Sequence, residues 1–191
     1  MHIWIDLDNH KHVPLVKAFS NELRGRGHTV TVTALNTNEI KNALKEHSFE
    51  AKVIGKIFSF FGLFEQSLYE VRIARIFDYL QFQGKLDAFF SLGSKTMLYS
   101  CLHYYFPIIF LLDAYKDKYN TWYPCLKRYC FIFPENTPDQ IIIQQGYDIK
   151  SIVKYKGFID KEGFNHSLIS VKDIISLIES QSKHVPGGIN A

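Results

Sequence analysis

The 191-residue sequence has few cysteines, no long hydrophobic run and no dense basic segment. Its three cysteines are an odd number without a repeated spacing, which argues against a secreted disulfide framework and favours a reducing cytoplasm. The first residues form a strand-like segment and not a signal peptide. The longest apolar stretch, residues 104–112, contains Pro107 and is shorter than the roughly 18 residues of a membrane span. We expect a cytoplasmic protein, with membrane contact limited to the periphery.

The sequence also has little excess of charge of one sign. The sequence has 22 Lys and Arg against 19 Asp and Glu, a net charge of +3, and the cations are scattered. Nucleic-acid-binding proteins gather their cations in a patch or stripe, so we expect no nucleic-acid partner. A chain that is 47% hydrophobic and 15% aromatic can form a buried core, and its length fits one domain.

Short apolar runs alternate with longer amphipathic segments along the chain. Strands are predicted at Ile3–Asp6, Val30–Ala34, Ala51–Ile54, Ala88–Leu92, Ile108–Leu112, Tyr129–Phe133 and Ile152–Tyr155. Helices are predicted over Pro14–Gly25, Asn38–Glu46, Glu65–Gln83, Ser94–Tyr105, Pro138–Gly146 and around Val171–Ile178. Strands that alternate with helices imply βαβ units, so we expect an α/β fold with a Rossmann-like doubly wound parallel sheet.

Polar side chains cluster where the first predicted strand ends. Asp6 closes the strand, Asp8 and Asn9 follow in the loop, and His12 lies beside the first helix. A histidine in this position can act as a general base, and a carboxylate can orient it. The alternative is that Asp6 or Asp8 caps the loop and the helix, and that His12 is merely exposed.

A second candidate loop, Leu92–Thr96, follows the fourth predicted strand and opens a helix. Gly93 permits a close backbone approach, Ser94 can cap the helix, and free N–H groups attract an anion such as phosphate. The same residues also suit an ordinary glycine-serine turn with a capped helix.

An aromatic run at residues 57–64 lies beside Lys56, with Arg72 and Arg75 nearby in the sequence. If exposed, it would form a lipid-docking or partner-binding patch, whereas if packed it is the entry to the long helix. We favour packing for most of the rings, because buried aromatic side chains dominate protein cores.

Several segments resemble a prokaryotic family called domain of unknown function 354. Ile3–Asn9 with His12–Val13, followed by Arg26–Val30, resembles the family's opening "IWIDxxNxPHV" and its "RGHEV" segment. Later matches are Ser91–Lys95 with "SHGSRS", Pro134–Glu135 with "PE" and Tyr155–Phe158 with "YxG". The resemblance spans residues 1–164.

This family is similar to GT-B glycosyltransferases and UDP-N-acetylglucosamine 2-epimerases, which have two Rossmann-like domains around one active site. The resemblance implies a fold like a GT-B N-terminal domain over residues 1–164, with a C-terminal helix and loose tail over residues 165–191. It implies the acceptor-binding half of a glycosyltransferase, which takes a nucleotide-sugar or glycan ligand and needs a donor-binding domain or partner chain. The implied catalytic residues are His12 and Asp8. The implied substrate-binding residues are Asn9, Gly93, Ser94, Lys95, Asp113 and Glu135.

The sequence departs from the family at Lys11, where the family has Pro, at Leu92, where it has His, and over residues 113–116. Two alternatives therefore stay open. The chain is a non-catalytic or truncated carbohydrate- or partner-binding module, or Asp6 and Asp8 serve a Mg²⁺-dependent phosphatase of the haloacid dehalogenase type. Cys101, His103, Cys125 and Cys130 lack the spacing of a zinc site, so we expect no metal or other cofactor.

Overall fold

The computed structural model describes residues 1–55, 65–100, 108–111, 130–135, 137–144, 149, 152–155, 159–160, 163–164 and 171–182. The aromatic run at 57–64, Asp113, Cys101, His103 and Cys125 lie outside the described residues.

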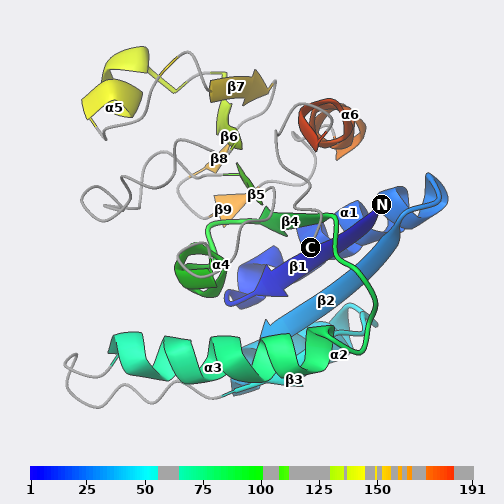
Figure 1. Ribbon diagram of the computed structural model, residues 1–191. Coiled ribbons are helices and arrows are strands. Elements are labelled where there is room, and N and C mark those ends of the chain that lie inside the picture. The colour runs from blue at the N-terminus through cyan, green and yellow to red at the C-terminus, as the bar shows by residue number, and fades with distance from the viewer. Residues whose placement is uncertain are drawn as a thin grey trace.

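Seven parallel strands form the central sheet (Figure 1), and all seven predicted strands are confirmed to within about one residue at each end. They are β1 (His2–Leu7), β2 (Thr29–Leu35), β3 (Lys52–Ile54), β4 (Ala88–Ser91), β5 (Ile108–Leu111), β6 (Cys130–Pro134) and β7 (Ile152–Tyr155). Their order is β3-β2-β1-β4-β5-β6-β7, so the chain winds outward from β1 in one direction and from β4 in the other. A small antiparallel pair, β8 (Ile159–Asp160) and β9 (Gly163–Phe164), was not predicted.

Six α-helices of the described chain are close to the predicted ones. They are α1 (Val13–Gly25), α2 (Asn38–Glu46), α3 (Glu65–Leu80), α4 (Lys95–Ser100), α5 (Asp139–Gln144) and α6 (Val171–Ser182), with a 3₁₀ turn, η1 (His10–His12), before α1. Proline in the first turn starts α1, and the Thr37 hydroxyl starts α2 by accepting from the Ile40 amide at 3.2 Å. The predicted helix Ser94–Tyr105 is described only as far as Ser100.

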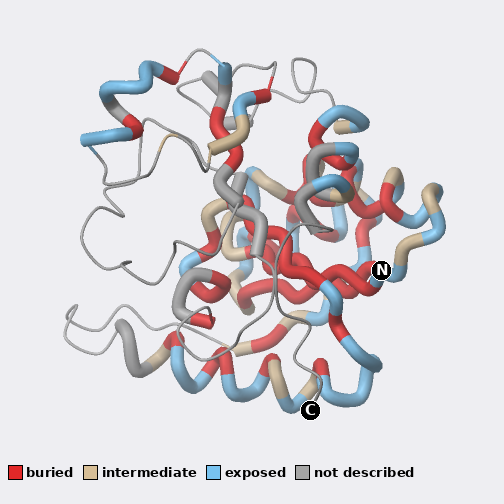
Figure 2. Tube along the Cα trace, turned by 45° about the horizontal axis from the view of Figure 1, so that its top comes forward, coloured by how far each residue is buried: buried red, intermediate tan, exposed pale blue. Residues whose placement is uncertain are grey.

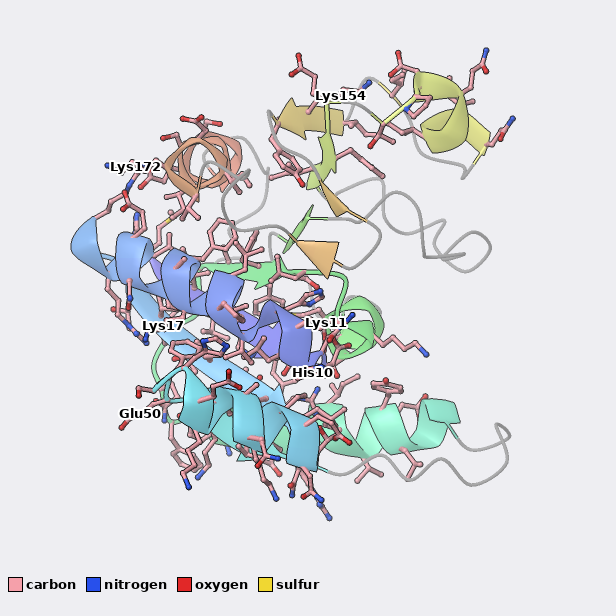
Figure 3. All side chains as sticks on the ribbon, turned by 180° about the vertical axis from the view of Figure 1, so that it is seen from behind. His10, Lys11, Lys17, Glu50, Lys154 and Lys172 are labelled. Carbon is pink, nitrogen blue, oxygen red and sulfur yellow. The ribbon has the colours of Figure 1, made fainter. Side chains whose placement is uncertain are left out.

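Side chains of β1 alternate between two covered faces of the sheet. Ile3, Ile5 and Leu7 belong to the core cluster that contains Phe19 and Leu23 of α1. Trp4 points to the other face, where its ring meets Phe77 of α3 edge-on at 5.6 Å. Helices α3 and α4 lie on that face in Figure 1, whereas the view from behind shows α1 and α2 on the opposite face (Figure 3). Burial on both faces explains why the central strands β1 and β4 are almost continuously apolar (Figure 2).

Helix α6 packs on α1, although about 150 residues separate them. Ile174 and Ile175 are fully buried and belong to the same core cluster as β1 and α1. At the rim, Glu179 accepts hydrogen bonds from Arg26 at 3.0 Å and contacts His28 at 2.8 Å. Apolar packing and a partly exposed ion-pair group therefore hold α6 against α1 and the turn before β2.

Candidate switch-point site

The predicted polar loops meet where the winding of the sheet reverses. β1 and β4 are hydrogen-bonded neighbours, with Asp6 beside Ser91, and their carboxyl ends lead into residues 8–12 and 92–95. Open α/β sheets bind ligands at this point, because the two loops diverge to opposite sides of the sheet. We call Asp8, Asn9, His12, Gly93, Ser94 and Lys95 the switch-point site.

The β4–α4 loop is fixed by its own backbone and by β1. Gly93 has a φ of 76°, which favours glycine. The Ser94 amide donates to the Ser91 hydroxyl at 3.0 Å, and the Ser94 hydroxyl donates to Asp6 Oδ2 at 2.8 Å. Ser94 is only 1% exposed, and its side chain holds the loop against β1.

Asp6 is the buried centre of the region. Arg72 of α3 donates to both carboxylate oxygens, from Nη2 to Oδ1 at 2.7 Å and from Nη1 to Oδ2 at 2.8 Å. Thr33 of β2 and Ser94 add one donor each, at 2.5 and 2.8 Å. A carboxylate with four donors is fully satisfied, which offsets the cost of removing its charge from water.

The same burial argues against Asp6 as a phosphatase nucleophile. Its side chain is 0% exposed, and both oxygens are engaged. A nucleophile must reach the phosphorus atom, which this carboxylate does not. Among the described residues, no group of three His, Cys, Asp or Glu side chains is placed to hold a metal ion.

Asp8 lies two residues after Asp6 and differs from it in its hydrogen bonding and its pKa. Its Oδ2 accepts a hydrogen bond from the Lys95 amide at 2.8 Å. Burial, together with the negative charge of Asp6, raises the pKa of Asp8 to about 7, against the opposing effects of the Lys95 amide and the Arg72 charge. A carboxyl group with this pKa can give or take a proton near neutral pH.

Asn9 and His12 occupy the turn that leads into α1. The Asn9 side chain caps η1 by accepting from the Lys11 amide at 3.0 Å. His12 is half-buried, and its amide donates to the Asn9 carbonyl at 3.1 Å. The exposed His10 and Lys11 mark this turn in Figure 3, close to α4. The side chain that caps this turn is therefore that of Asn9, and not that of Asp6 or Asp8, while His12 is the N-cap residue of α1.

Glu135 belongs to another part of the sheet edge. It is exposed just after β6, and its amide donates to the Tyr155 carbonyl at 2.8 Å. Strands β4 and β5 separate β6 from β1, so Glu135 is not brought together with Asp8. Asp113 lies outside the described residues.

The role of Arg72 was not predicted from the sequence, where it was noted only as a cation near the aromatic run at residues 57–64. Arg72 is 1% exposed, and besides Asp6 it donates to the Ile54 carbonyl at 3.0 Å and to the Thr96 hydroxyl. A signal existed, because Tyr69 and Ile76 are buried one turn to either side of it. An arginine on the buried stripe of a helix requires a buried anion, and Asp6 is that anion.

Comparisons with known proteins identify the fold. No family model matches the sequence, and no curated protein matches it. The Anabaena HepE protein in complex with UDP and glucose matches with a TM-score of 0.58 and 16% identity, over 83% of this chain and 45% of that one. The Neisseria meningitidis UDP-GlcNAc 2-epimerase bound to UDP-GlcNAc matches with a TM-score of 0.57 and 13% identity, over 96% and 50%. A glycosyltransferase from Rickettsia africae matches with a TM-score of 0.54 and 12% identity, over 98% and 50%.

The chain has the Rossmann-like fold of part of a GT-B protein. It spans about half the length of these solved structures. Identities this low establish the fold alone. In the described part of the chain, no helix is long and apolar enough to cross a bilayer.

Proposed function

We propose that the chain is the acceptor-binding half of a GT-B-like glycosyltransferase, with the donor-binding half supplied by a further domain or a partner chain. The observation that carries this proposal is that the loop after β1, which contains Asp8 and His12, and the glycine loop after β4 both leave the switch point of the sheet, in a chain that matches about half of a glycosyltransferase structure. The resemblance of residues 3–13 and 26–30 to the start of a GT-B-like family supports the acceptor side. The UDP and glucose bound to HepE and the UDP-GlcNAc bound to the Neisseria epimerase support a nucleotide-sugar donor.

In this mechanism, the acceptor hydroxyl lies against the loop after β1. His12 removes the hydroxyl proton as the oxygen attacks the anomeric carbon of the donor sugar, and the bond to the nucleoside diphosphate breaks. Asp8 is a second group that can hold a proton near neutral pH. The leaving diphosphate is stabilised by the donor-binding half.

The test uses the full assembly, recovered from the native host with the tagged chain as bait. His12→Ala and Asp8→Asn should each lower the turnover number for sugar transfer by about 10²–10⁴-fold, the usual contribution of a general acid-base group. His10→Ala is the matched control, because His10 is exposed in the same turn. It should change transfer less than about threefold.

Two results would contradict the proposal. If the purified chain transferred sugar alone, no second half would be needed. If the assembly bound the sugar nucleotide but His12→Ala and Asp8→Asn left transfer intact, the chain would be a binding module and not part of the catalytic machinery.

A further inference from the structure

Arg72 joins three parts of the carboxyl edge of the sheet. It donates to the Ile54 carbonyl at the end of β3, to Asp6 on β1 and to Thr96 in α4. Asp6 and Thr96 come from segments that are 90 residues apart in sequence, so no local structure fixes their spacing. A guanidinium has a planar fork of five donors, which can hold several acceptors at once in one geometry.

Two carboxylates on β1 and its exit hold two consecutive residues of the β4–α4 loop. Asp6 accepts from the Ser94 hydroxyl, and Asp8 accepts from the Lys95 amide, both at 2.8 Å. Thr96, the next residue, accepts from Arg72. The position of Asp8 relative to Lys95 therefore depends on contacts that Arg72 makes one and two residues away.

We propose that Arg72 is a positioning residue, which clamps the β4–α4 loop against β1 and so keeps the Asp8 carboxyl on the Lys95 amide. This inference rests on the proposed function only where it treats the switch point as a reaction site. Arg72 is only 1% exposed, so it acts through Asp6, Thr96 and the loop.

Asp8 reports on this clamp because its proton affinity depends on the same contacts. The charged groups that act on it are Asp6 from β1 and Arg72 from α3, and the Lys95 amide donates to it from α4. The Lys95 ammonium lies 6.0 Å from the centre of the Tyr69 ring. Losing the amide hydrogen bond removes an interaction that favours the ionised carboxylate, so the pKa of Asp8 rises.

The test follows the Asp8 carboxyl carbon and the Lys95 amide by NMR in the purified chain, as a function of pH. Arg72→Lys keeps the charge but loses the fork, and Thr96→Val removes one acceptor with little change in shape. We expect Arg72→Lys to raise the Asp8 midpoint by roughly half a unit or more and to speed hydrogen exchange at Lys95 by about tenfold. Thr96→Val should also raise the Asp8 midpoint and speed exchange at Lys95, but by smaller amounts.

Arg75→Lys is the control, because Arg75 is exposed on the same helix. It should leave both readouts unchanged. The inference would be overturned if folded Arg72→Lys and Thr96→Val both kept the wild-type Asp8 midpoint and the wild-type exchange rate at Lys95. That outcome is expected if Arg72 only stabilises the fold. If Arg72→Lys does not fold, Thr96→Val decides alone. The titration needs no sugar donor, so its failure and a failure of sugar transfer are separate results.

Discussion

Arg72 and Asp6 form a two-armed ion pair inside the protein, with Nη2–Oδ1 and Nη1–Oδ2 distances of 2.7 and 2.8 Å across 66 residues of sequence. Both side chains are almost fully buried. The pair joins the helix on one face of the sheet to the strand that leads into the switch-point site. Asp8, two residues later, is the carboxyl group whose charge can change near neutral pH, because its pKa is raised to about 7.

The first prediction concerns removal of one charge from this pair. Asp6→Asn leaves the Arg72 guanidinium buried without its anion, which should lower the free energy of unfolding by about 3–5 kcal/mol. Urea denaturation at pH 7 measures this change. Asp78→Asn, at an exposed position of α3, should stay within about 0.5 kcal/mol of wild type. An Asp6→Asn loss below about 1 kcal/mol would show that the pair is not energetically coupled to folding.

The second prediction is a pH dependence. The pKa of Asp8 is raised to about 7 in the folded protein, above the value of about 3.9 in an unfolded chain. The folded state therefore binds more protons between about pH 4 and 7, so the contribution of Asp8 to stability falls as the pH rises through this window.

Asp8→Asn removes that cost and can still accept from the Lys95 amide. Relative to wild type, the variant should gain about 1–4 kcal/mol between pH 4 and pH 8. Thermal unfolding over this pH range measures the difference, with Glu50→Gln as an exposed acid-to-amide control. A pH-independent difference between Asp8→Asn and wild type would contradict the raised pKa.

The third prediction uses two glycines. Gly55 has a φ of 74°, and a Cβ there would lie 2.8 Å from Cγ of Arg72. Gly55→Ala should therefore cost about 2 kcal/mol or more, since strain and a displaced Arg72 add together. Gly25→Ala meets no atom within 4 Å in the last turn of α1, and alanine there should be neutral or stabilise by up to about 1 kcal/mol. Equal effects at both sites would contradict the close approach of Arg72 to Gly55.

The fourth prediction separates the contacts that hold α6. Ile174→Ala opens a cavity in the core and should cost about 2–5 kcal/mol, whereas Glu179→Gln breaks a partly exposed ion-pair group and should cost less than about 1 kcal/mol. Denaturant melts of both variants provide the comparison. Ile143→Ala, at a position 55% exposed, serves as the control for loss of side-chain atoms. The reverse order of the first two costs would mean that charge, and not packing, docks α6.

The sheet was predictable because its strands are short apolar or alternating runs between helical patterns, and the central strands β1 and β4 are buried on both faces. The meeting of the loops after β1 and β4 followed from the parallel topology. The partner of Asp6 did not follow, because Arg72 reaches it across the long connection between β3 and β4. Sequence spacing also could not show that Ser94 turns inward to Asp6 and leaves the Lys95 amide to Asp8.

We propose that this chain binds the acceptor and that another domain or chain binds the donor. Nucleotide-sugar binding is the measurement that separates the two roles. Calorimetric titration of UDP-sugars into the purified chain, and into the assembly recovered from the native host, compares the two states. We expect no measurable binding by the chain alone and binding by the assembly in the micromolar to millimolar range common for enzyme substrates. Equal affinity in both states would contradict it, because the donor site would then lie in this chain.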